Sequence, residues 1–308
     1  MLASALHRPS DVVASLASCV ARKTASLPFL IQQFVLRARE LELIRYQSPT
    51  GWIWEDDKIE AADIPDDAVG MMTAKIESLD EDSKTTIRFA SCVGYEFNAS
   101  LLTELSGWQR RSIEHGLFVL AECGLIAPCG RGYRFAHDRI REAAQGLLDE
   151  NERRSLHLST ARILIAQLSK PELDARILEV ADHLDRALSL VPEEDRLQAI
   201  QLNLDAARKA LAGGTAATAE RYLAAARMLF GDEHWLSNRQ LGFDLYVASS
   251  DSASLCEMFD AALQYLDLVE RQGFAGLDAA RIAALRLRIY AASRTAEETG
   301  RYLLELLS

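Results

Sequence analysis

The sequence predicts a mostly α-helical protein with two short β-hairpins, and three observations support this fold class. Apolar residues recur at helical spacing along most of the 308 residues. Short apolar stretches flank turn residues at two places, as expected for hairpins. Beyond Asp149 the chain continues as helical segments separated by glycine- and proline-containing breaks. These patterns predict three domains, at residues 1–62, 63–149 and 150–308.

The first domain is predicted to contain two helices followed by a small hairpin. The second of these helices opens at Pro28, because proline suits the first position of a helix. The hairpin would join residues 43–46 to residues 52–54. Trp52 and Trp54 would point to the same side of a strand, and we interpret them as packing residues.

The second domain is predicted to be a winged helix, because helices precede a short hairpin and a further helix follows it. The expected helices cover residues 64–79, 81–92, 99–105 and 108–123. Two short apolar strands then flank the glycine-containing turn Cys129–Gly132. His137 stands at the start of the next helix, whose apolar residues Ile140, Ala143 and Ala144 face one way.

The third domain is predicted to be an α-solenoid of stacked helix pairs. Its helices show a degenerate period of 40 positions, which differs from the tetratricopeptide spacing of about 34. A period of this kind indicates helix pairs that bury their apolar faces against neighbouring pairs. The pattern is carried by Tyr222, Leu223, Ala226 and Leu229, then by Ala262, Leu263, Leu266 and Val269, then by Tyr302, Leu303 and Leu306.

Composition narrows the function classes. The net charge of -11 disfavours binding to nucleic acid, since the phosphate backbone would be repelled. The five cysteines have no C-x-x-C spacing, so neither a disulfide framework nor a zinc site is predicted. No apolar run approaches the roughly 18 residues of a membrane span, and the first residues lack signal-peptide features. We therefore expect a cytoplasmic protein without a membrane span.

Several ordered segments together resemble one family. They are Lys23–Leu30, Gln33-Phe34, Trp52–Trp54, Asp66–Met72, Cys92–Phe97, Tyr133–Ala144, Arg154–Ile163 and Ala181–Leu184. The chain resembles the STAND-class AAA-type ATPase module of large bacterial signalling proteins. In those proteins a serine/threonine kinase domain typically precedes the module, and GAF and histidine-kinase domains follow it. The resemblance implies the small helical end of an AAA-type ATPase core, then a winged helix, then a TPR-like helical arm.

The resemblance also implies two nucleotide-contacting residues. Pro28 matches the proline of the family's Gly-x-Pro sensor motif, although Ser26 stands where the family has glycine and Leu30 where it has an aromatic residue. His137 matches the histidine that approaches the β-phosphate of ADP in STAND relatives. Each residue also has a structural interpretation. Pro28 would simply begin a helix, and His137 would cap a helix or pack against the hairpin.

The sequence contains no G-x-x-x-x-G-K-[ST] motif, so the phosphate-binding loop of the family is expected before Met1. This chain alone is therefore expected to be non-catalytic and to hold no cofactor, with ATP or ADP bound in the intact parent protein. No metal site is expected either. His157 and His183 lack further ligand types at metal spacing and are interpreted as structural. The serines at residues 249–252 are interpreted as helix-start residues rather than catalytic ones.

Six arginines could form a basic patch on the winged helix, but acidic residues interleave with them. The arginines are Arg110, Arg111, Arg131, Arg134, Arg139 and Arg141, and the acidic residues are Glu114, Glu122 and Glu142. A salt-bridged surface or a contact between domains is therefore favoured over a DNA-binding face.

Three functional hypotheses remain open from the sequence. The leading one is a regulatory fragment of a STAND-type ATPase that couples nucleotide state to protein–protein signalling in a bacterial kinase pathway. Its partners would be proteins or other domains of the parent, bound by the helical arm. The second is a stand-alone helical-repeat scaffold that binds proteins. The third is a winged-helix regulator that binds DNA.

Overall fold

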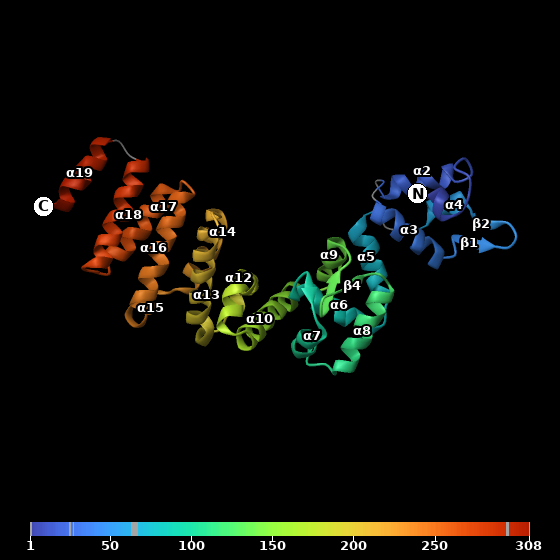
Figure 1. The fold of residues 1–308 in the computed structure, drawn as a ribbon, viewed down its shortest axis with the longest axis horizontal. Coiled ribbons are helices and arrows are strands. Elements are labelled where there is room, and N and C mark those ends of the chain that lie inside the picture. Colours follow the sequence, from blue (N-terminus) through green and yellow to red (C-terminus); the bar gives the residue numbers. More distant parts are fainter. Residues whose placement is uncertain (1, 25, 27, 63–66, 294–295, 308) are drawn as a thin grey trace. The chain divides into compact units, whose positions relative to one another are not determined.

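Figure 1 shows the computed structural model, which describes residues 2–24, 26, 28–62, 67–293 and 296–307. As predicted, the protein is mostly helical; its described part also has a two-stranded and a three-stranded sheet. The chain forms two compact units, Met1–Arg153 and Arg154–Ser308. Their division lies inside helix α10, close to the predicted boundary at residue 149. The finer division of the first unit at residue 62 stays a prediction.

The N-terminal part has more helices than the sequence predicts. Its elements are α1 (Leu2–Ala5), α2 (Ala14–Thr24), α3 (Pro28–Glu40), β1 (Ile44–Gln47), β2 (Gly51–Trp54) and α4 (Asp56–Ala61). The short helices α1 and α4 were not predicted. Strands β1 and β2 pair antiparallel as expected. The Trp52 ring meets the Tyr46 ring edge-on with centroids 5.6 Å apart and lies 5.2 Å from the Arg39 guanidinium. The packing interpretation of Trp52 is therefore confirmed.

The following elements have the order predicted for a winged helix, with one strand added. They are α5 (Ala68–Glu77), α6 (Glu81–Val93), β3 (Glu96–Phe97), α7 (Ala99–Ser106), α8 (Arg110–Glu122), β4 (Ile126–Cys129), β5 (Gly132–Phe135) and α9 (Asp138–Gly146). The sheet order is β3-β5-β4, and every pair is antiparallel. Strand β3 was missed in the sequence because two residues carry no visible alternation.

Two positions in this part require glycine, because a neighbouring element lies too close to leave room for a side chain. A Cβ on Gly132 would lie 2.3 Å from the Phe97 carbonyl oxygen, so only glycine lets β5 pair with β3 at that point. A Cβ on Gly116 would lie 2.4 Å from the Thr86 hydroxyl, so α8 can pack this closely against α6. The side chains between these elements form a buried core that includes Ile87, Leu102, Ile113, Leu117, Leu120 and Phe135.

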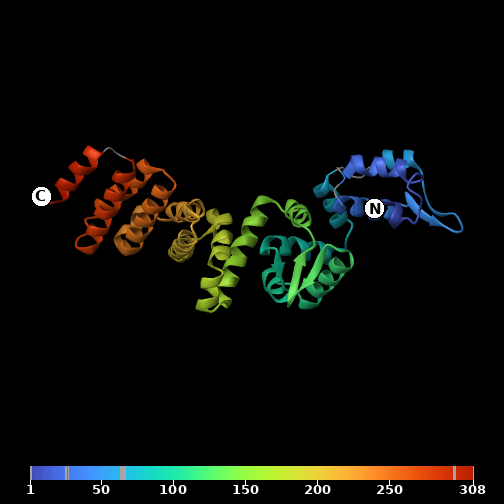
Figure 2. The ribbon, with the colours of Figure 1, turned by 45° about the horizontal axis from the view of Figure 1, so that its top comes forward.

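The second unit is an array of helices, which Figures 1 and 2 show following one another. Its elements are the greater part of α10 (Glu150–Gln167), then α11 (Lys170–Ala175), α12 (Ile177–Arg186), the 3-10 helix η1 (Leu188–Leu190), α13 (Glu193–Ala212), α14 (Ala216–Leu229), α15 (Asp232–Ser237), α16 (Arg239–Leu255), α17 (Phe259–Glu270), α18 (Leu277–Ser293) and α19 (Ala296–Leu307). The pairs α13–α14 and α16–α17 pack most extensively, and α14 also packs against α16. The array therefore has the stacked-pair arrangement that the sequence predicts.

The 40-residue pattern is buried in its first copy, mostly buried in its second and partly exposed in its third. All four positions of the first copy, in α14, are buried. In the second copy Leu263 is only partly buried and packs against the core of α16, α17 and α18. In the third copy Leu303 is 44% exposed. The side chain of Leu306 lies outside the described residues.

The serines of residues 249–252 do not begin a helix, so their interpretation was wrong. Ser249, Ser250 and Ser252 lie inside α16 and are fully buried. The Ser250 hydroxyl donates to the Ala262 carbonyl in α17 at 2.8 Å, and the Ser252 hydroxyl donates to the Ala216 carbonyl in α14 at 3.2 Å. These small polar side chains therefore join neighbouring helices, a role that depends on packing and not on local sequence.

None of the helices in the described part is both long and apolar enough to span a membrane.

Candidate functional site

The two positions singled out by the resemblance lie at the starts of two helices of the first unit. Pro28 is the exposed first residue of α3, as its helix-start interpretation predicts. Two residues earlier, Ser26 has a φ of 59°, a left-handed conformation that glycine adopts at lower cost. Ser26 thus has a backbone conformation that favours glycine, at the position where the resemblance implies a glycine. Leu30, at the aromatic position of that motif, is buried in the core.

His137 is the N-cap residue of α9. Its backbone is extended, and its Nδ1 accepts a hydrogen bond from the Arg139 amide at 3.1 Å. An Nδ1 that accepts carries no hydrogen, so the ring hydrogen of the neutral imidazole is on Nε2. Asp138 follows in the first turn, where the helix dipole stabilises a negatively charged side chain. The capping interpretation of His137 is thus confirmed, and phosphate contact stays a prediction.

Helix α5 connects the elements that carry these two residues, because it packs against both α3 and α9. Within that contact the Lys75 ammonium donates to the Gln33 side-chain oxygen of α3 at 3.1 Å. The same ammonium donates to the carbonyl of Cys123, at the end of α8, at 2.8 Å. Lys75 therefore ties α3 to the winged-helix part. The sequence offered no signal for this link, since Lys75 and its partners are 42 and 48 positions apart.

Two of the six arginines of the candidate basic patch form ion pairs with acidic residues of the same helix. Arg110 pairs with Glu114 at 2.7 Å, and Arg139 pairs with Glu142 at 2.6 Å. Arg141 donates through Nε to the Ser91 carbonyl at 3.1 Å. The salt-bridged interpretation is confirmed for Arg110 and Arg139. The exposed side chains of the patch that remain are Arg111, Arg131 and Arg134.

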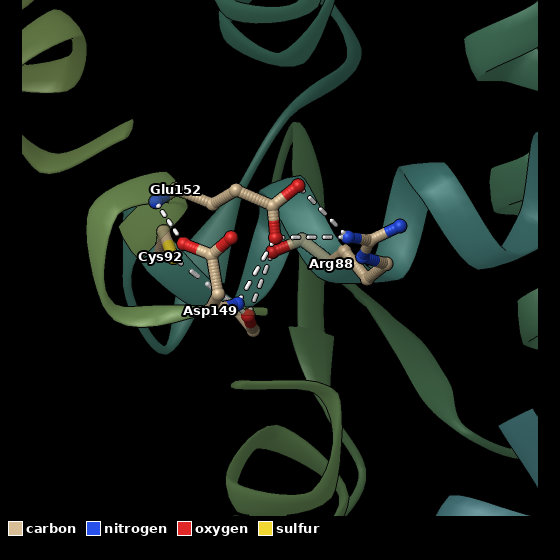
Figure 3. A network of polar contacts seen from close by, with 5 residues as sticks. Arg88, Cys92, Asp149 and Glu152 are labelled. Atoms are coloured by element: carbon tan, nitrogen blue, oxygen red, sulfur yellow. Dashed lines mark hydrogen bonds and ion pairs between the residues drawn. The ribbon is translucent and has the colours of Figure 1, made fainter. Parts of the chain in front are cut away.

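A polar network holds the first turn of α10 against the winged-helix part (Figure 3). Asp149 and Glu152 form a reciprocal cap. The Glu152 amide donates to Asp149 Oδ1 at 2.8 Å, and the Asp149 amide donates to Glu152 Oε2 at 3.0 Å. Arg88 of α6 donates through Nη2 to both carboxylate oxygens of Glu152 at 3.3 Å. The buried Cys92 lies beside this network. All four residues belong to the first unit, so the network lies within that unit.

In the second unit an ion-pair cluster joins α12 to α14. Arg221 of α14 pairs with Asp182 at 2.6 Å and with Asp185 at 3.2 Å. The Tyr222 hydroxyl donates to Asp182 at 2.8 Å. Burial raises the pKa of the Asp185 carboxyl to about 7; Arg221 opposes this shift and the neighbouring Asp182 charge adds to it. Burial, with the Asp182 contact, likewise raises the pKa of Tyr222 to about 12.

The two histidines interpreted as structural form a buried pair. His157 of α10 and His183 of α12 are 4% and 5% exposed, and their Nδ1 atoms lie 2.9 Å apart. At that distance one Nδ1 must donate and the other must accept, so a single hydrogen lies between the rings. This pair joins two helices, and the sequence alone did not indicate it.

One cluster of the described residues has atoms close enough to hold a cation. It contains Glu193, Glu233 and His234, whose candidate atoms lie within 4.8 Å of one another. However, His234 Nδ1 already accepts a hydrogen bond from the Gly231 amide at 2.9 Å, and both carboxylates are exposed. This arrangement gives no second sign of a ligand, so it does not change the expectation that no metal site is present.

Comparison with known proteins yields one similar sequence and one similar structure. No family model matches the chain. The chain is 23% identical over 331 aligned positions to the hybrid signal transduction histidine kinase G of Dictyostelium discoideum. That match takes in 86% of this chain and 10% of the relative, so the chain spans about a tenth of the relative's length.

The similar solved structure is a STAND protein with a tetratricopeptide repeat sensor from Pyrococcus horikoshii. The two chains share 12% identity, and the match covers 89% of this chain and 52% of that one. The TM-score is 0.31, which is too low to establish a common fold.

Proposed function

We propose that this chain is a regulatory, non-catalytic module of a STAND-type signalling ATPase. In this proposal the winged-helix part reports whether ATP or ADP is bound, and the helical arm passes that state to protein partners or to other domains. The observation that carries the proposal is the match of 86% of the chain to one stretch of a signal transduction histidine kinase. A match over this length supports a shared module rather than one shared motif.

The non-catalytic part of the proposal rests on chemistry that the 308 residues do not supply. They contain no G-x-x-x-x-G-K-[ST] sequence, so no Walker-type loop with its lysine is present to surround a phosphate chain. Phosphoryl transfer depends on such positioned donors, because they stabilise the charge of the transition state. ATP or ADP would therefore be held mainly by an ATPase core, with Pro28 near the base and His137 near the β-phosphate.

The geometry of α9 supports this role for His137. The first amides of a helix and its dipole favour a bound anion. The His137 ring stands at this end of α9, and the cap bond directs the ring hydrogen to Nε2, which could donate to a phosphate oxygen. Binding there would add a contact to the winged-helix part in one nucleotide state and not in the other, which is the condition for a switch.

Two substitutions separate the capping role of His137 from the phosphate role. Asparagine retains a side-chain cap, whereas alanine does not. In the chain alone, His137→Ala should lower the free energy of unfolding by about 1 kcal/mol and His137→Asn should restore it. Joined to a P-loop ATPase core, both variants should lose the ADP-dependent protection of α9 from amide hydrogen exchange. If His137→Asn kept that protection, the histidine would be a cap and nothing more.

The non-catalytic claim is tested by phosphate release from the purified chain. We expect no release above background from ATP and weak or absent binding of ATP and ADP. Hydrolysis that His137→Ala abolished would overturn both the non-catalytic claim and the module that we propose.

The scaffold alternative makes a different prediction for the same fusion. A stand-alone helical-repeat protein would bind its protein partners equally in the presence of ATP and ADP. Nucleotide-dependent capture of a partner by the arm would support the regulatory module instead. The DNA-binding alternative is disfavoured by the ion pairs of Arg110 and Arg139, which occupy part of the basic patch.

A further inference from the structure

A hollow of about 420 Å³ opens on the surface of the second unit. This volume is within the usual range of small-molecule pockets, which is about 300 to 1,000 Å³. Five elements surround it, namely α10, α12, η1, α13 and α14. Its lining residues include Arg154, Arg186, Arg196, Asp185, Ser189 and Met228. All belong to one compact unit, so the hollow is a feature of the arm itself.

The lining is rich in guanidinium groups, in a chain whose net charge is -11. Arg154 donates to the Ser189 hydroxyl at 3.4 Å, and Arg196 pairs with Glu193 at 2.5 Å. Arg186 is exposed, and no hydrogen bond or ion pair joins it to another residue of the described part. Three cationic residues from three elements thus line one hollow in which Asp185 is the one acidic lining residue, an arrangement that favours an anion.

A second wall of the hollow is apolar. Leu188, Val191 and Leu229 line it together with Met228, whose side chain is 78% exposed. Methionine adapts its shape to a ligand and makes favourable contacts with aromatic rings. The hollow therefore offers a charged side for an anionic head and an apolar side for the group that carries it.

We propose that this pocket of the arm binds a phosphate monoester carried on an apolar, preferably aromatic, body. Arginine is suited to this head group because its planar fork can donate two parallel hydrogen bonds to phosphate oxygens. A phosphorylated tyrosine side chain and a small aryl phosphate share this chemistry. The pocket is independent of the nucleotide role proposed for the winged-helix part, because it is formed by residues of the second unit alone.

The ionisation state of Asp185 should change the affinity of the pocket for phosphate. It faces Arg221 of α14, Asp182 of its own helix and the Asn203 side chain of α13, and it lines the same hollow as the three arginines. An ionised Asp185 repels a bound phosphate, whereas a neutral amide in its place does not. Asp185→Asn should therefore strengthen binding at pH 8.

The test is calorimetric titration of the full chain with phenyl phosphate, inorganic phosphate and phenol. Phenyl phosphate should bind saturably and more tightly than either fragment. Arg186→Ala and Arg186→Glu should weaken its binding at least about tenfold, because a hydrogen bond between charged groups is lost. Arg271→Ala, which changes an exposed arginine away from the hollow, is the matched control and should leave binding unchanged.

Met228→Ala distinguishes the contribution of the apolar wall from that of the charged wall. It should weaken the binding of phenyl phosphate but not the binding of inorganic phosphate. Arg186 and Met228 are exposed, so these variants should keep the wild-type thermal melt. The absence of saturable binding of phenyl phosphate at millimolar concentration would overturn the proposal. So would binding that neither Arg186→Glu nor Met228→Ala changes.

A final comparison identifies the source of the phosphate monoester. A phosphotyrosine peptide that binds at least tenfold more tightly than phenyl phosphate, and that loses binding on dephosphorylation, would assign the pocket to a protein partner. Equal affinity for the two probes would assign it to a small aryl phosphate. Tighter binding of the unphosphorylated peptide would contradict the proposal.

Discussion

Replacing Asp185 by asparagine should change how the stability of the protein depends on pH. Burial raises the pKa of this carboxyl from 3.8 to about 7 in the folded chain. As pH rises between these values, the unfolded chain loses the proton while the folded chain keeps it. The folded state then binds more protons than the unfolded state, so its stability falls over this window. The stability of the Asp185→Asn variant does not fall in this way, because the asparagine side chain has no titrating proton.

The size of the effect follows from the shift in pKa. One unit corresponds to about 1.4 kcal/mol, so a rise from 3.8 to about 7 amounts to about 4 kcal/mol in full. Most of that falls between pH 5 and pH 8, where the linkage relation gives a change of about 2 to 3 kcal/mol. The ion pair with Arg221 forms only as Asp185 ionises toward the upper end of this window, and Arg221 keeps its contact with Asp182 in the variant. The pH dependence is therefore the informative quantity, rather than the stability at one pH.

The assay is urea unfolding of the full chain at pH 5, 6, 7 and 8, followed by circular dichroism. The free energy of unfolding of Asp185→Asn minus that of wild type should rise by about 2 to 3 kcal/mol across the series. Asp174→Asn, which changes an exposed carboxyl in the neighbouring helix α11, is the control and should give a flat difference. A flat difference for Asp185→Asn as well would refute the claim that burial holds this carboxyl neutral.

Three further outcomes can be checked directly. Leu223 is fully buried, so Leu223→Ala should cost about 2 to 5 kcal/mol in urea melts, whereas the exposed Arg271→Ala should cost under about 0.5 kcal/mol. Because Leu263 is only partly buried, Leu263→Ala should cost less than Leu223→Ala, and equal costs would contradict this ranking. Binding to duplex DNA should be absent at about 0.15 M salt; submicromolar affinity that Arg111→Ala abolished would restore the DNA-binding hypothesis.

The resemblance of the sequence singled out Pro28 and His137, and both lie at helix starts. These positions depend on local chemistry, because proline suits the first turn and a side chain at the N-cap satisfies a free amide. Whether Pro28 or His137 contacts a nucleotide depends on residues that are distant in the sequence. Nucleotide contact by these two residues therefore stays a prediction. The pocket around Arg186 could not be predicted in this way, because its lining comes from five elements separated in the chain.

What the sequence by itself determined is the order and type of most elements, from α5 to the helical arm. Helical periodicity and turn residues act over a few positions, so they are visible without the fold. Tertiary structure alone decided the strand β3, which exists through its pairing with β5, and the roles of Ser250 and Ser252, which join neighbouring helices. It also decided that Asp185 is buried beside Arg221, because residues 36 positions apart meet only when α12 and α14 pack together.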